Sequence, residues 1–164
     1  MAEHRWSLIC QSVRTDANNN LDLTGVIDEV HVAPIPSEVT DGAAVALDAQ
    51  VVSVWHRDTW DTPERLQMRL VFHGPRPNLD RLGETQPFGV NVWEYPVVRV
   101  SARLPPLPLR GFGVYRIRIE KRRDEGAPWV HAGGDITLGI WEAPAGAAIG
   151  ATLSNANVAS KGTL

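Results

Sequence analysis

The stretch VSVWHRDTWDTPERLQM brings aromatic, imidazole and carboxylate side chains together within seven positions. Its Asp-x-x-Asp spacing could offer oxygen ligands to a hard cation, but a calcium loop needs more oxygens and a glycine for its sharp turn. A loop tryptophan beside polar groups is better suited to stacking on a sugar or a partner surface, and the alternative is a solvated turn between two strands. The residues predicted to contact a ligand or partner are His56, Asp58, Trp60 and Asp61.

A second chemical feature is a set of arginines that alternate with apolar residues in two segments. VVRVSARL contains Arg99 and Arg103, and VYRIRIEK contains Arg116 and Arg118. If these segments pair as a hairpin, the four guanidinium groups share one basic face that could bind an anionic partner. An acidic protein fits this face better than nucleic acid, because no aromatic residues interleave with the arginines. The alternative is a solvated face in which acids such as Glu120 are interspersed.

No catalytic motif is recognisable in the chain. It lacks a Gly-x-Ser-x-Gly elbow, a Walker loop and a dinucleotide fingerprint. The five histidines have no metal-ligand spacing, and Cys10 has no second cysteine beside it. We therefore expect a non-catalytic protein without a metal or a cofactor.

Strict period-2 alternation of apolar and polar residues predicts the elements that position these groups. In ERLQMRLVFHG, for example, Leu66, Met68, Leu70 and Phe72 share one face and the polar residues share the other. The same pattern in AVALDAQVVSVW assigns Trp55 to the core. Seven or eight such segments, separated by turn residues and proline-rich connections, predict an all-β fold. We expect a single antiparallel β-sandwich with little helix, and a β-barrel is the alternative.

The first two predicted strands, RWSLICQSV and LDLTGVIDEVHV, are joined by RTDANNN. Three consecutive asparagines tolerate left-handed backbone geometry, so this segment is expected to form a hairpin turn. The apolar alternation slips at Gly25, which predicts a β-bulge there.

The last part of the chain differs in composition from the rest. Residues 143–164 are rich in Ala, Gly, Ser and Asn and contain few large apolar groups. Such a segment is either a flexible tail or an arm that docks on this subunit or another. The expected division is a β-sandwich domain over residues 1–142 and a tail or docking arm over residues 143–164.

Composition and charge narrow the function classes. The chain has 164 residues, 43% of them hydrophobic and 21% charged, as expected for one soluble domain. No signal peptide or membrane-spanning run is recognisable, so we expect a cytoplasmic protein or part of a particle assembled there. Residues 1–63 carry a net charge of −7 and residues 64–164 carry +4. This asymmetry suggests head-to-tail self-association into a homo-oligomer.

The N-terminal segment LICQSVRTDANNNLDLTGVIDEV resembles the opening of an uncharacterised bacterial β-sandwich family, a domain of unknown function. The family pattern is a Cys-x-Ser-Val strand, a turn that contains Asp, and Leu-x-Leu-x-Gly-(Ile/Val)-x-Asp. The matching residues here are Cys10, Ser12, Val13, Asp16, Leu21, Leu23, Gly25, Val26 and Asp28. The resemblance covers about 25 residues closely and implies the fold; it implies no activity.

Together these patterns predict a bacterial or phage protein that works by binding. The leading hypothesis is a structural or protein-interaction β-sandwich, an assembly component that uses its C-terminal tail. The alternative is a small-ligand or carbohydrate-binding module that uses the loop at residues 56–61.

Overall fold

The computed structural model describes residues 2–34, 43–57, 64–75, 80–92 and 95–144, and the backbone of residues 152–155. This part of the chain forms thirteen strands in three sheets and contains no helix, so the predicted all-β sandwich is confirmed. None of its segments is therefore a helix long and apolar enough to cross a membrane.

Sheet A has the strand order β2-β1-β5-β9. Its strands are β1 (Glu3–Thr15), β2 (Leu21–Ile27), β5 (Gln50–His56) and β9 (Val97–Arg103). All neighbours in sheet A are antiparallel.

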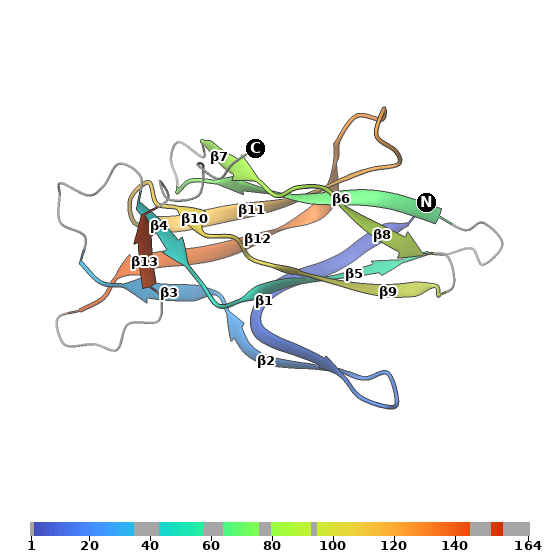
Figure 1. The fold of residues 1–164 in the computed structure, drawn as a ribbon, viewed down its shortest axis with the longest axis horizontal. Helices are drawn as coiled ribbons and strands as arrows, with labels where there is room; N and C mark the ends of the chain where they lie inside the picture. The colour runs from blue at the N-terminus through green and yellow to red at the C-terminus, as the bar shows by residue number, and fades with distance from the viewer. Residues whose placement is uncertain are drawn as a thin grey trace, which may run out of the picture.

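Sheet B has the order β3-β12-β11-β6-β7, and β8 pairs with the other half of the same edge of β6. Its strands are β3 (Glu29–Val32), β6 (Glu64–His73), β7 (Arg81–Glu84), β8 (Phe88–Val92), β11 (Gly113–Arg122) and β12 (Val130–Glu142). Only the pairing of β3 with β12 is parallel. Sheets A and B form the two layers of the sandwich in Figure 1.

A small third sheet, sheet C, lies at one end of the sandwich (Figure 1). It has the order β10-β4-β13 and contains β4 (Ala43–Ala46), β10 (Leu107–Pro108) and β13 (Thr152–Asn155). The thirteen strands exceed the predicted seven or eight for three reasons, of which the first is that the C-terminal segment contains β13. Two predicted strands are each divided between two sheets, and the proline-rich connections contain the short strands β7, β8 and β10.

The joints between the sheets are short. Asp28 alone separates β2 of sheet A from β3 of sheet B, and its carbonyl accepts a hydrogen bond of 2.8 Å from Gly139 N–H of β12. Leu47, Asp48 and Ala49 alone separate β4 of sheet C from β5 of sheet A. Both joints are thus fixed to the body of the sandwich.

The core lies between the sheets, where the alternating apolar residues of both layers meet. On β6, β11 and β12 the faces are those predicted from the sequence, and Trp55 of β5 is fully buried. Burial of these side chains is the main favourable contribution to the folding free energy. The predicted inward residues of sheet B are all buried: Leu66, Met68, Leu70, Phe72, Tyr115, Ile117, Ile119, Ile136, Leu138 and Ile140.

Strand β5 is buried on both faces, which simple alternation did not predict. Val52 and Val54 point to the outer side of sheet A, yet only 1% and 8% of their surfaces are exposed. The hairpin of β1 and β2 lies on this outer side (Figure 1). Its tip is tied to β9, because Arg99 Nη1 donates to both the carbonyl and the Oδ1 of Asn19, each at 2.9 Å. The hairpin thus folds back along the sheet from which it starts.

The turn of this hairpin confirms the role predicted for its Asp and Asn residues. Asp16 Oδ1 accepts bonds from the Asn18 and Asn20 N–H groups at 2.9 and 2.7 Å, and Asn19 has a left-handed φ of 63°. The Asn20 side-chain amide also donates to Asp16 Oδ2 at 2.9 Å; this bond first, and the backbone bonds after it, favour the ionised carboxylate and lower the pKa of Asp16. Gly25 also has a positive φ, of 63°, but β1 and β2 keep one register on both sides of it. The β-bulge predicted at Gly25 is therefore wrong, because no residue is inserted there.

A tyrosine corner fixes the connection from β10 to β11. The Tyr115 hydroxyl accepts a bond from Arg110 N–H and donates one to the Gly111 carbonyl, both at 2.8 Å. The ring is 98% buried, and burial raises the pKa of the phenol. A hydroxyl that ties a loop back to the strand in this way is common in sandwich folds.

Replacing Tyr115 by Phe removes both bonds while it keeps the buried ring. We expect the free energy of unfolding to fall by about 1–2 kcal/mol, measured by urea denaturation. The matched control is Tyr95→Phe, since Tyr95 is 64% exposed and should change stability little. Equal stability of Tyr115→Phe and the unaltered protein would show that the corner contributes nothing.

Candidate functional site

The structure describes one of the four residues predicted to form the ligand-contact loop. His56 is the last residue of β5, where it pairs with Glu3 of β1 and Val97 of β9. Arg5 Nη2 lies 2.8 Å from His56 Nδ1 and can donate to it. Asp58, Trp60 and Asp61 lie outside the described residues. The contact loop therefore stays a prediction, anchored at His56.

The predicted basic face is wrong as a single surface. Strand β9, which carries Arg99 and Arg103, pairs with β5 in sheet A. Strand β11, which carries Arg116 and Arg118, lies between β12 and β6 in sheet B. The two pairs of arginines are thus on opposite layers of the sandwich. Alternation correctly placed them outside the core, but it does not indicate which strands are neighbours.

Three of these four arginines pair with a carboxylate. Arg103 lies 3.0 Å from Asp48, in a pair so exposed that it adds little stability. Arg116 and Arg118 share Asp135, at 3.4 and 3.8 Å. Arg99 differs, because within the described ranges its polar partners are the two neutral oxygens of Asn19. It is therefore the member of the set that has no carboxylate partner among the described residues.

The outer face of sheet B carries a network that the sequence did not reveal. Arg69 binds Glu84 and Glu120, with N–O distances of 3.0 and 2.7 Å. Trp129 lies between two guanidinium groups, with its ring centre 4.3 Å from Arg69 Cζ and 4.5 Å from Arg122 Cζ. These cation–π contacts hold the β11–β12 loop against the sheet. Arg69, Glu120 and Trp129 are therefore occupied by partners within the sheet and its loop.

The C-terminal segment includes a strand that adds to the edge of β4. Strand β13 is antiparallel to β4, with Thr152 opposite Ala46 and Asn155 opposite Ala43. β10 covers the other edge of β4. Because Ala43, Ala44 and Val45 are buried, this strand is enclosed on its faces as well as its edges. Of the two alternatives for the tail, residues 152–155 form a docked arm.

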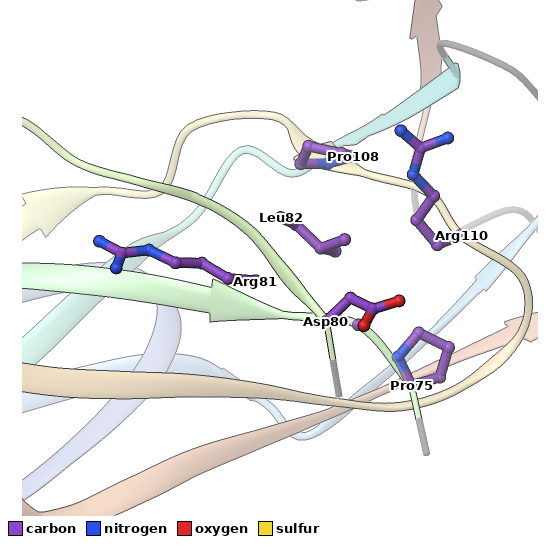
Figure 2. Close-up of a pocket in the computed structure, with 7 residues that line it drawn as sticks. Pro75, Asp80, Arg81, Leu82, Pro108 and Arg110 are labelled. Atoms are coloured by element: carbon purple, nitrogen blue, oxygen red, sulfur yellow. The ribbon is translucent and has the colours of Figure 1, made fainter. Parts of the chain in front are cut away.

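A hollow of about 490 Å³ opens on the other side of sheet C, next to β10. Figure 2 shows Leu82 near Asp80 and Pro108, whereas the Arg81 side chain points away from this group. Arg81 pairs with Glu84, and the Arg110 guanidinium is turned away from Asp80 in this view. The charged groups of this hollow therefore do not converge on a common point.

A partly buried polar chain lies at the seam where β1 and β12 run side by side. His4 Nε2 is 2.6 Å from Ser7 Oγ, which in turn is 2.6 Å from Ser53 Oγ. Gly133 and Gly134, with φ of 95° and 67°, form a bulge in β12 at this seam. A Cβ at Gly134 would lie 3.7 Å from His4 Cε1, an ordinary contact, so the left-handed φ and not lack of space favours glycine at this position.

Ser7 and His4 have the spacing of a nucleophile and its base, but their surroundings indicate a structural role. Ser53 is 1% exposed, and its hydroxyl needs a partner because an unpaired buried hydroxyl is costly. The nearest carboxylate system, His131 with Asp135 at 2.9 Å, is directed to the outer face through Arg116 and Arg118. Within the described ranges, no three His, Cys, Asp or Glu residues form a metal-binding group.

Comparison with known proteins identified no relative. No family model matches the chain, and no curated protein matches it significantly. The resemblance of the N-terminal segment to an uncharacterised family therefore stays a prediction, and function must be inferred from the residues themselves.

The seam predicts a pH dependence of stability. Burial lowers the pKa of His4, and the charges of Lys121 and His131 lower it further, although backbone hydrogen bonds at Gly133 and Trp6 oppose this. The unfolded chain, with a histidine pKa near 6.5, then binds more protons than the folded one. The stabilising contribution is thus present above about pH 6.5 and is lost as the pH falls through the folded pKa.

We expect the urea midpoint to fall more steeply from pH 7.5 to 5.5 in the unaltered protein than in His4→Gln, which cannot titrate at this position. Comparison of the two proteins removes the contribution of the other four histidines. Parallel pH profiles would contradict a buried, neutral His4.

Proposed function

We propose that the protein is a non-catalytic assembly component, whose C-terminal strand can add to β4 of a second copy. The observation that supports this is the pairing of β13 with β4, which is a strand-addition contact made by the chain with itself. Backbone hydrogen bonds supply the affinity in such contacts, and the same bonds are available to a strand from another chain.

Strand β4, which accepts the C-terminal strand, depends on that neighbouring strand for its stability. Ala43, Ala44 and Val45 of β4 are buried, so an uncovered edge would leave backbone groups in an environment poor in water. The small alanine side chains add little burial energy of their own. A strand at this edge therefore contributes most of what holds β4 in place, whichever copy provides it.

The short connection between β12 and β13 sets the concentration at which exchange occurs. Residues 143–151 join the two strands, and a short tether gives an effective concentration of about millimolar. A second copy competes with this intramolecular strand only at a similar concentration, or where copies are held close together. Exchange of an identical element between protomers is a low-cost route to oligomers.

The assembly hypothesis is tested by Leu153→Pro combined with Ser154→Pro. Two adjacent prolines remove two backbone donors from β13, and at least one of them faces β4. We expect the full-length protein to associate as its concentration rises from micromolar to millimolar, and the double variant to remain monomeric. Sedimentation velocity measures both.

The matched control places the same two prolines at Ser160 and Lys161, C-terminal to β13. This control should associate like the unaltered protein. The proposal fails if the full-length protein is monomeric throughout this range, or if the β13 variant still associates.

A further inference from the structure

An open cleft of about 610 Å³ lies between the tip of the β1–β2 hairpin and the beginning of β9. Its volume is in the range of sites that bind small molecules. The hairpin and β9 come from distant parts of the chain, and the Arg99–Asn19 bonds hold them together. The residues that line the cleft are Thr15, Asn19, Tyr95, Val97, Val98 and Arg99.

Arg99 gives the cleft a preference for anions. Its Nη1 binds Asn19, which fixes the plane of the guanidinium, and a guanidinium has five N–H donors in all. No carboxylate of the residues described here pairs with it, in contrast to Arg103, Arg116 and Arg118. A fixed guanidinium with unused donors is suited to binding a carboxylate or phosphate through two hydrogen bonds.

The remaining lining groups suit a sugar ring. Tyr95 and Val97 are 64% and 45% exposed, so they offer an aromatic ring and an apolar wall to the solvent. The Asn19 amide and the Thr15 hydroxyl can exchange hydrogen bonds with ligand hydroxyls. A few polar groups around an aromatic surface are typical of sites that recognise small polar molecules.

The cleft also joins two groups that the sequence left apart. Val97 is paired with His56 in the antiparallel register, so the end of β5 that begins the predicted contact loop lies beside the cleft. Arg99, from the predicted basic face, lies two residues further along β9. The cleft thus contains Arg99 from the predicted basic face and adjoins His56 from the predicted contact loop.

We propose that this cleft binds a sugar that carries one carboxylate or phosphate group and no nucleobase. The anionic group bonds to Arg99, the ring packs against Tyr95 and Val97, and the hydroxyls bond to Asn19 and Thr15. This binding is independent of the C-terminal strand and does not require assembly.

The test is calorimetric titration of the full-length protein with glucuronate, glucose 6-phosphate, glucose and adenosine monophosphate. We expect at least one of the two anionic sugars to bind at least tenfold more tightly than glucose, and the preferred one identifies the anionic group. Equal binding of glucose, no binding of either anionic sugar, or tighter binding of the nucleotide would overturn the proposal.

Asn19→Asp is the most specific variant for this test. Asp has the shape of Asn, tolerates the left-handed φ of this position and can still accept from Arg99, but it neutralises the guanidinium. We expect affinity for the anionic sugar to fall at least tenfold, while the thermal midpoint is unchanged or higher. Tyr95→Ala, at an exposed position, should weaken binding without unfolding the protein.

Arg103→Gln is the matched control, because Arg103 lies on the same strand and face as Arg99 but outside the cleft and pairs with Asp48. It should bind like the unaltered protein. Unchanged binding by both Asn19→Asp and Tyr95→Ala would contradict the assignment of the cleft.

Discussion

Backbone N–H and C=O groups at the edge of a β-sheet need a partner, a cover or water, and this constraint shapes much of the molecule. β7 and β8 share one edge of β6, and β3 pairs along the outer edge of β12. The C-terminal strand meets the same need at β4. Each of these short strands is thus explained by the edge that it closes.

The sequence predicts well which face of each strand is buried, but it predicts poorly which strands are neighbours in a sheet. Period-2 alternation identified the buried residues of β6 and β11 because each strand has one face toward the core. It could not show that β9 and β11 belong to different sheets, since pairing depends on contacts between distant segments. It also failed on β5, where Val52 and Val54 of the predicted outer face are buried.

The candidate sites were predictable only in part, for a similar reason. His56 and Arg99 were recognisable as unusual residues from the local pattern. Only the strand register shows that the end of β5 lies beside the beginning of β9. The charge of Arg99 becomes distinctive only when the partners of the other arginines are known. Tyr95 gave no signal in the sequence, because an exposed ring looks like any tyrosine until the surface around it is defined.

The short joints have a consequence for any assembly that uses β4. Asp28 ties sheet A to sheet B, and residues 47–49 tie sheet C to sheet A, so the three sheets have little freedom to slide or rotate against one another. A strand that enters sheet C from another copy would take its direction from β4. Every copy in such an assembly would then receive its neighbour's strand in the same antiparallel direction, so the assembly would have a polarity set by the fold itself.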